Sequence, residues 1–246
     1  MSVPVFLAAA EALQGDEILL DGPEGRHAAT VRRLRPGERV DLTDGAGTVA
    51  ECVVRDARKD ALLLTVQSRY GVAPPRPRVI VAQGLPKGDR GELAVEMMTE
   101  TGVDVIMPWS ASRSVVRWKG DRAAKALARW RATAREAGKQ SRRFHLPEVT
   151  EPVTSAELAE RLREVAAHGL AVVLHEEAER PLSGLTPPPG GDVLLVIGPE
   201  GGIAGEELEL FQAAGAVPAV LGPTILRTST AGVAAAAVLL ARCGRW

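Results

Sequence analysis

The chain has 246 residues, of which 46% are hydrophobic and 3% aromatic, so it is long enough for one or two domains with a core of Ala, Val and Leu. No apolar run reaches the ~20 residues that span a bilayer, the first residues lack the pattern of a secretory signal, and two distant cysteines, Cys52 and Cys243, exclude a disulfide framework and a cysteine metal site. The net charge of -1 hides one strongly basic segment, and we expect a soluble cytoplasmic protein without a bound metal.

The first 72 residues predict a small β-barrel with one helical insertion. Asp44 and Gly45 open a hairpin turn between two of its strands, and a short helix over 27–33 is stopped by Pro36 and Gly37. Arg32 and Arg33 belong to a basic cluster in this part of the chain. Runs of β-branched and apolar residues predict strands at residues 6–7, 17–20, 38–43, 48–54 and 61–66.

The proline-rich stretch 72–77 predicts a linker, because proline disfavours both helices and central strands. After it the pattern alternates between strand and helix, which is typical of a mostly parallel sheet covered on both sides by helices. The sequence therefore predicts a barrel domain over 1–72 and an α/β domain over 77–246. We expect strands at 78–83, 103–108, 170–174, 192–197 and 217–221, and helices at 89–101, 157–167, 206–214 and 230–242.

The segment 113–143 holds eleven basic and two acidic residues, a charge of +9 that leaves -10 for the rest of the chain. A long helix is predicted here, with an apolar stripe that includes Leu127 and Trp130. Its opposite face carries Arg129 and Lys139 among other cations, with almost no acidic partners one turn away to relieve their repulsion. An ordinary solvated helix face is one interpretation; contact with a polyanion such as nucleic acid is the other, and we favour it.

The most informative stretch reads VIGPEGG at residues 196–202. A buried strand ends there in a turn of glycines, a proline and a carboxylate, and a helix follows, which is where open α/β sheets bind ligands. A tight turn that needs its glycines for backbone geometry alone is the alternative.

The strands that end near Leu174 and Leu221 would add their loops to the same crevice, with apolar walls and exposed backbone suited to a flat heteroaromatic ligand. The sequence contains no dinucleotide fingerprint, P-loop, nucleophile elbow or metal-ligand spacing.

Four stretches together resemble the RsmE family of ribosomal RNA uridine-N3 methyltransferases, members of the SPOUT superfamily. They read LPKGDR at 85–90 with TETGV at 99–103, EAGKQSRR at 136–143 with Pro147, IGPEGG at 197–202 with Glu206 or Glu207, and LGPTILRT at 221–228. Residues 27–35 also resemble the N-terminal element of that family. The order and spacing of the stretches agree with the family over nearly the whole chain.

The resemblance implies a PUA-like barrel that helps to hold RNA, followed by an α/β domain with a trefoil knot. It implies a homodimer that uses S-adenosylmethionine to methylate N3 of a uridine in small-subunit (16S) ribosomal RNA, free or within the subunit. The residues expected to bind the cofactor are Leu174, His175, Glu176, Ile197, Gly198, Pro199, Gly201, Gly202, Leu221, Gly222, Ile225, Leu226 and Thr230.

Two residues are candidates for catalysis. Arg227 is expected to stabilise the negative charge that develops on the uracil oxygens when the N3 proton leaves, or else to form a structural ion pair with Glu200 or another carboxylate. Glu200 is a candidate general base, or a cap for the amides that follow it. The residues expected to contact RNA are Arg32, Arg33, Lys87, Arg90, Arg113, Gln140, Arg142 and Arg143.

One position departs from the family. Many members read LRTETA where this chain has Ser229 in LRTSTA, so no carboxylate is present there, although Ser229 or Thr230 can still cap the last helix. The departure motivates one alternative to the uridine-N3 methyltransferase, a non-catalytic RNA-binding or ribosome-assembly factor on the same fold. A second alternative, within enzymes, is a ribose 2′-O-methyltransferase on the same scaffold.

Overall fold

The computed structural model describes residues 3–246, and these form two compact units. The first unit runs to Pro74 and also includes Gly138–Leu146, whereas the second comprises Pro75–Ala137 and Pro147–Trp246. The return of Gly138–Leu146 to the first unit was not part of the predicted domains 1–72 and 77–246. No helix among the described residues is long and apolar enough to cross a membrane.

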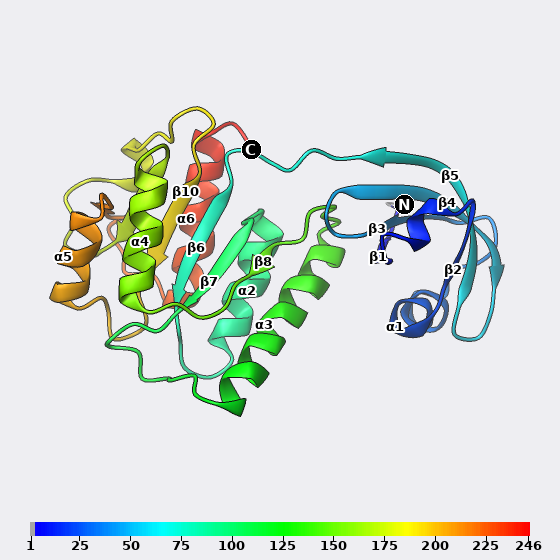
Figure 1. Ribbon diagram of the computed structural model, residues 1–246, viewed down its shortest axis with the longest axis horizontal. Helices are drawn as coiled ribbons and strands as arrows, with labels where there is room; N and C mark the ends of the chain where they lie inside the picture. Colours follow the sequence, from blue (N-terminus) through cyan, green and yellow to red (C-terminus); the bar gives the residue numbers. More distant parts are fainter. Residues whose placement is uncertain (1–2) are drawn as a thin grey trace. The chain divides into compact units, whose positions relative to one another are not determined.

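The first unit is built on a five-stranded sheet in the order β1-β3-β4-β5-β2 (Figure 1). Only β1 and β3 pair in parallel, and the other neighbours are antiparallel. Phe6, Leu42 and Leu62 are buried in the core that the curled sheet encloses. The strands are β1 (Val5–Leu7), β2 (Glu17–Leu20), β3 (Arg39–Thr43), β4 (Thr48–Ala57) and β5 (Leu62–Gly71), with a short 3₁₀ turn at Ala12–Gln14.

The helical insertion of the barrel begins earlier than the sequence predicted. Helix α1 spans Gly22–Arg26, and one π-helical turn continues it over His27–Val31. Pro23 lies in the first turn of α1, where its fixed φ suits a helix start and its missing N–H has no partner to lose. The predicted range 27–33 therefore missed the whole of α1.

The second unit contains a six-stranded sheet in the order β11-β9-β10-β6-β7-β8, and every neighbouring pair is parallel. All side chains of β6 and β10 are buried, because both faces of the sheet are covered. Its strands are β6 (Val79–Gly84), β7 (Val105–Trp109), β8 (Glu148–Val149), β9 (Leu170–Leu174), β10 (Val193–Ile197) and β11 (Val217–Ala219).

Five helices cover this sheet in two layers (Figure 1). One layer packs on strand residues such as Val79 and Val81, and the other on their alternating neighbours Ile80 and Ala82. The first layer consists of α2 (Arg90–Thr101), α3 (Asp121–Gln140) and α6 (Thr228–Arg242), and the second of α4 (Ser155–Ala166) and α5 (Gly205–Ala213); a 3₁₀ turn lies at Leu182–Gly184. The predicted fold class, a parallel α/β domain preceded by a small PUA-like barrel, is confirmed.

The basic helix α3 has the predicted apolar stripe, since Leu127, Trp130 and Ala134 are buried. The prediction for its charged face was partly wrong. Lys139 is only 7% exposed, and its Nζ donates to Glu24 at 2.8 Å within the first unit.

Repulsion along α3 is also relieved from outside the helix. Arg129 pairs with Glu92 at 2.9 Å, and Arg131 pairs with Glu151 at 3.0 Å. Carboxylates from other segments thus act as the acidic partners that α3 does not have one turn away. The repulsion between its basic side chains is therefore smaller than the sequence predicted.

Candidate functional site

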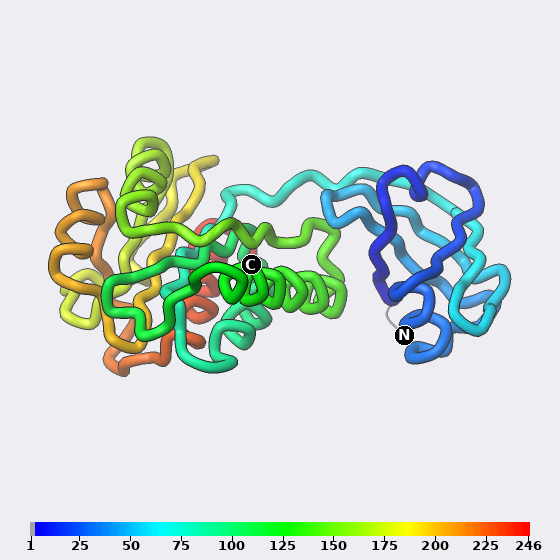
Figure 2. The backbone as a smooth tube through the Cα atoms, turned by 60° about the horizontal axis from the view of Figure 1, so that its bottom comes forward, coloured from blue at the N-terminus to red at the C-terminus, as the bar shows by residue number. Residues whose placement is uncertain are grey.

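The second unit has a cavity of about 920 Å³ where the carboxyl ends of β9, β10 and β11 meet. Three loops line it, and in the tube view they lie together in yellow-green to orange-red (Figure 2). Both predicted catalytic residues line the cavity, and so do all the predicted cofactor residues except Thr230. Four further lining residues belong to the stretches LGPTILRT and LRTSTA but had no predicted role: Pro223, Thr224, Thr228 and Ala231. The sequence did not single out the remaining ones: Glu177, Ile203, Gly205, Leu208, Ala219 and Val220.

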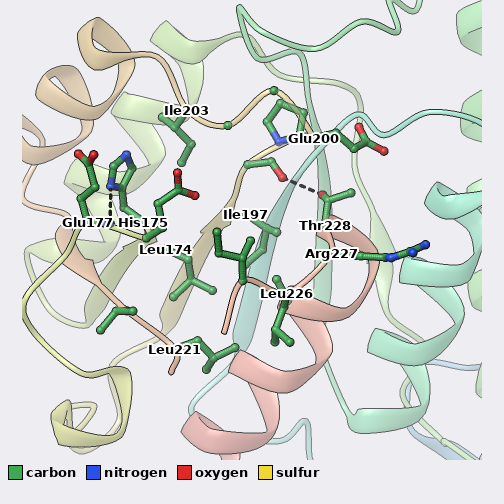
Figure 3. Close-up of a pocket in the computed structure, with 18 of the residues that line it drawn as sticks. Leu174, His175, Glu177, Ile197, Glu200, Ile203, Leu221, Leu226, Arg227 and Thr228 are labelled. Atoms are coloured by element: carbon green, nitrogen blue, oxygen red, sulfur yellow. Dashed lines mark hydrogen bonds between the residues drawn. The ribbon is translucent and has the colours of Figure 1, made fainter. Parts of the chain in front are cut away.

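One side of the cavity is apolar. Leu174, Ile197 and Leu221 lie where three parallel strands end or just beyond, and their side chains lie close together with that of Leu226 (Figure 3). The two predicted catalytic side chains, Glu200 and Arg227, point to a different side, away from Leu174 and Leu221 (Figure 3). The arrangement therefore places apolar walls beside a polar rim.

The loop after β10 is held from behind by β6 and α6. The Thr228 hydroxyl donates to the carbonyl of Gly198 at 2.7 Å and accepts from Nε2 of Gln83 at 2.9 Å (Figure 3). A Cβ on Gly84 would lie 2.6 Å from the backbone nitrogen of Pro199, so the two backbones touch here. Thr228 joins the two segments through these bonds, a role that its place at the end of the stretch LGPTILRT did not reveal.

The loop after β11 is the opposite case. Residues 222–227 are all exposed, with Ile225 at 81% and Leu226 at 39%. Among residues 3–246, no backbone N–H of 221–226 donates a hydrogen bond, so these N–H groups, which every residue of the stretch except Pro223 has, are available to a ligand. Exposed main chain beside apolar side chains is what recognition of a flat heteroaromatic ring requires.

The two candidate catalytic residues do not pair with each other. Glu200 accepts a hydrogen bond from the backbone amide of Lys87 at 3.2 Å, and its carboxylate lies 3.8 Å from the guanidinium of Arg90. It does not cap the amides that follow it, so that alternative was wrong. Within the part of the chain that the structure describes, Arg227 forms no ion pair, which leaves its guanidinium free for a ligand.

The start of α6 also differs from the prediction. The helix begins at Thr228 with Arg227 as its N-cap residue, and no side chain caps it, so neither Ser229 nor Thr230 plays that role. Ser229 is buried in the first turn. Thr230 donates to the carbonyl of Arg227 at 3.1 Å and lies outside the cavity lining. The helix tolerates the missing cap because its first residues are fixed by the Thr228 contacts.

Glu207 is a buried carboxylate close to the cavity, in the first turn of α5. Burial acts to raise its pKa, but hydrogen bonds from Ser155, Ser112 and the amide of Ala204 outweigh burial, so the pKa lies below its usual range. The sequence shows only a glutamate three positions after Ala204, a spacing typical of a helix start.

The predicted RNA-binding residues are divided between the two units. Arg90 and Arg113 line the cavity, and Lys87 lies beside Glu200 through its backbone. Arg32, Arg33, Gln140, Arg142 and Arg143 belong to the first unit, and their contact with RNA stays a prediction. Among residues 3–246, no group of three or more His, Cys, Asp or Glu side chains is arranged to hold a metal ion.

Comparison with known proteins agrees with this geometry. Residues 74–240 match the RNA methyltransferase domain family, and residues 20–67 match the RNA methyltransferase PUA domain. The ribosomal RNA small subunit methyltransferase E of Mycobacterium bovis is 48% identical over 94% of this chain and 89% of the relative. The protein of the same name from Bacillus subtilis is 32% identical over 86% of this chain and 85% of the relative.

Solved structures support the same relationship. Ribosomal RNA small subunit methyltransferase E from Neisseria gonorrhoeae, bound to S-adenosyl methionine, has a TM-score of 0.84 and 26% identity over 98% of both chains. A protein from Legionella pneumophila in complex with the cofactor SAM has a TM-score of 0.83 and 29% identity, again over 98% of both chains.

Proposed function

The chain belongs to the RNA methyltransferase family that includes ribosomal RNA small subunit methyltransferase E, and from this premise we propose that it uses S-adenosylmethionine to methylate N3 of a uridine in small-subunit (16S) ribosomal RNA. The observation that carries the proposal is the single cavity at the ends of β9, β10 and β11, apolar on one side and bordered by a free Arg227 on another.

The cavity fits the proposed cofactor. Its volume of about 920 Å³ is enough for a nucleoside with a side chain. The walls formed by Leu174, Ile197 and Leu226 suit the faces of an adenine ring, and the backbone N–H groups of 221–222 and 224–226 suit its ring nitrogens. When bound, S-adenosylmethionine supplies a methyl group made electrophilic by its sulfonium.

Arg227 acts on the target base in this proposal. The N3 atom of uracil is a poor nucleophile until it loses its proton, and that loss places negative charge on the neighbouring ring oxygens. A free guanidinium at the polar rim stabilises this charge, and such an interaction contributes about 100- to 1,000-fold to a rate. N3 then bonds to the methyl group as the carbon–sulfur bond breaks, and S-adenosylhomocysteine is left.

Glu200 is the candidate group that accepts the N3 proton. Its carboxylate is oriented by the amide of Lys87 and by Arg90. The same contacts suit a second role, in which Glu200 orients the first turn of α2. A Glu200→Gln variant separates the two roles: loss of the base lowers kcat with little change in cofactor affinity, whereas loss of orientation changes both.

We further propose that the protein works as a homodimer in the cytoplasm, where ribosomal subunits are assembled. Ile225 and Leu226 are large apolar side chains exposed at the rim of the cavity. A second copy of the chain is a suitable cover for them, because large exposed apolar groups beside a binding site mark interaction surfaces.

The decisive experiment uses small ribosomal subunits that lack the modification, together with cofactor labelled in its methyl group. We expect label at N3 of one uridine after nuclease digestion and nucleoside analysis. Label on a ribose oxygen would favour the 2′-O-methyltransferase. No transfer together with no cofactor binding in calorimetry would favour the non-catalytic RNA-binding factor.

The same assay tests the role of Arg227. We expect Arg227→Ala to lower kcat about 100-fold or more, while the Kd for S-adenosylmethionine stays within about threefold of wild type. Arg161→Ala on α4 is the matched control, since Arg161 is exposed and pairs only with Glu164. Equal activity of the two variants would remove Arg227 from the chemistry.

A further inference from the structure

The buried carboxylate of Glu207 joins three segments around the cavity. Its Oε1 accepts from the amide of Ser112 at 2.8 Å and from the hydroxyl of Ser155 at 2.6 Å. Its Oε2 accepts from the hydroxyl of Ser112 at 2.9 Å and from the amide of Ala204 at 3.2 Å. With only 6% of the residue exposed, Glu207 has no solvent role, so its charge serves these contacts.

Ser112 belongs to the loop between β7 and α3, and the next residue is Arg113, which lines the cavity. This loop packs backbone to backbone on the loop after β10. A Cβ on Gly201 would lie 2.7 Å from the carbonyl oxygen of Arg113 and 3.1 Å from its Cβ. The position of Arg113 is therefore defined on one side by Gly201 and on the other by the bonds of Glu207.

The loop is also closed on itself. Arg117 donates to the carbonyls of Ala111 at 3.2 Å and Ser112 at 2.8 Å. These bonds occupy the guanidinium of Arg117 with the main chain. The side chain of Arg113, in contrast, is exposed and forms no ion pair or hydrogen bond within residues 3–246. Its Nη1 lies near Gly202, 4.0 Å from the position that a Cβ would take there.

We propose that Glu207 is a positioning residue that holds Arg113 at the cavity rim, where the Arg113 guanidinium binds a phosphate of the RNA beside the target nucleotide. The inference rests on the proposed function and adds a named phosphate contact and the residue that orients it. A guanidinium fixed at its base presents two parallel donors to phosphate oxygens, and it loses little freedom on binding because the loop is already ordered.

Two features favour an RNA phosphate over the carboxylate of the cofactor as the anion. Arg113 is the first of a run of cations that continues through Lys119, Arg122 and Lys125, opposed only by Asp121. Such a run suits a chain of phosphates and exceeds what one carboxylate needs. Arg113 is also exposed where it lines the cavity, so its guanidinium is accessible to a phosphate outside the cavity.

A double-mutant cycle on the full-length protein tests the inference, with Arg113→Ala, Glu207→Gln and the pair combined. We expect each single variant to raise KM for the ribosomal subunit about tenfold, with kcat within about twofold and cofactor Kd unchanged. The combined variant is expected to be no worse than Arg113→Ala alone, because both changes remove the same contact. Glu206→Gln, an exposed neighbour, is the control.

Salt provides a second readout that a merely structural role would not change. If Arg113 binds a phosphate, Arg113→Ala reduces the slope of log affinity against log salt by about one, and Glu207→Gln reduces it by a similar amount. Ser112→Ala removes only the hydroxyl bond to Glu207 and is expected to shift KM in the same direction by a smaller factor, so it replaces Glu207→Gln if that variant does not fold.

Three outcomes would overturn the inference: additive effects in the cycle, an unchanged salt slope, or a raised Kd for S-adenosylmethionine with an unchanged KM for the subunit. The last would assign Arg113 to the cofactor carboxylate. If the wild-type protein transfers no methyl group, the proposed function fails, but binding of the subunit at several salt concentrations still decides whether Arg113 and Glu207 act together.

Discussion

The two loops that form opposite parts of the cavity are stabilised to very different degrees. The loop after β10 touches Gly84, accepts a hydrogen bond from Thr228 and is capped at its far end by Glu207. The loop after β11 is exposed from residue 222 to residue 227, and within the described residues its amides bond to nothing. The wall formed by the loop after β10 is therefore ordered before a ligand binds. The wall formed by the loop after β11 has backbone N–H groups and apolar side chains that only a ligand or a partner can contact.

This difference indicates that the two loops contribute to binding in different ways. A preformed wall binds without a further cost of ordering, so it sets where the cofactor sits. An exposed wall gains most of its contacts on association, so its contribution depends on what covers it. Substitutions where the first wall contacts β6 and α6, at Gly84 and Thr228, should therefore change folding and cofactor binding together, and substitutions on the second wall should change binding or self-association alone.

The largest effect is expected from Gly84→Ala. Its added methyl group would meet the nitrogen of Pro199 at 2.6 Å and the Gly198 carbonyl carbon at 3.0 Å, and backbone atoms cannot move aside cheaply. We expect a loss of about 3 kcal/mol in the free energy of unfolding and at least tenfold weaker cofactor binding. Urea unfolding and calorimetry measure the two quantities.

Gly222→Ala on the other wall is the matched control, because a Cβ there meets nothing within 4 Å. It should unfold like the wild type. Equal destabilisation by the two substitutions would show that the walls do not differ in rigidity.

Glu207→Gln is expected to cost about 2 kcal/mol at neutral pH, since hydrogen bonds to a buried charge are among the stronger ones. The folded-state pKa of Glu207 lies below its unfolded value, so this stability is present above about pH 4.3 and is lost as the pH falls through the folded-state pKa. Unfolding curves of both proteins should converge in acid. A difference in the free energy of unfolding between the two proteins that stays constant down to pH 3 would contradict a stabilising role for the Glu207 charge.

Thr228→Val should cost about 1 kcal/mol, because it leaves the Gly198 carbonyl and the Gln83 amide each without one partner. Cofactor binding is expected to weaken about tenfold through displacement of the loop after β10. Thr224→Val, at an exposed position that also lines the cavity, should leave stability unchanged. Thermal unfolding with and without cofactor separates the two variants.

The smallest effect on stability is expected at the most exposed apolar residue of the rim. Ile225→Asp should change the free energy of unfolding by less than about 0.5 kcal/mol, because the side chain is 81% exposed. If a second copy covers this position, sedimentation should show a shift from dimer to monomer. A monomeric wild type, or a variant that dimerises equally well, would remove Ile225 from an interface.

Sequence periodicity was sufficient for the architecture of the α/β unit, because continuous apolar strands and the stripe of Leu127 and Trp130 on α3 leave few other ways to bury them. Periodicity failed where contacts between distant residues determine the burial or pairing of a side chain. The burial of Lys139 depends on Glu24, and the pairing of Arg129 depends on Glu92, a partner that no local pattern shows. Helix α1 was missed because Pro23 and two glycines mask a helix start.

The candidate site shows the same division. Glycines and strand ends locate the cavity because they report on local backbone geometry. The stretches that resemble the family include Thr228 and Glu206 or Glu207, but the contacts of Thr228 and Glu207 became visible only in three dimensions, because they join residues far apart in the sequence. The free state of Arg227 likewise became visible only there. The assignment of roles to the lining residues stays a prediction until the variants are measured.

The detour of Gly138–Leu146 into the barrel unit has a consequence for anyone who wishes to study that unit in isolation. A gene fragment cut at Pro74 would encode Glu24 but not Lys139, so this buried carboxylate would lose the ammonium group that donates to it. The PUA-like unit is thus formed by two separate segments of the chain. A protein designed to contain this unit alone would have to include residues 138–146 as well as the N-terminal segment.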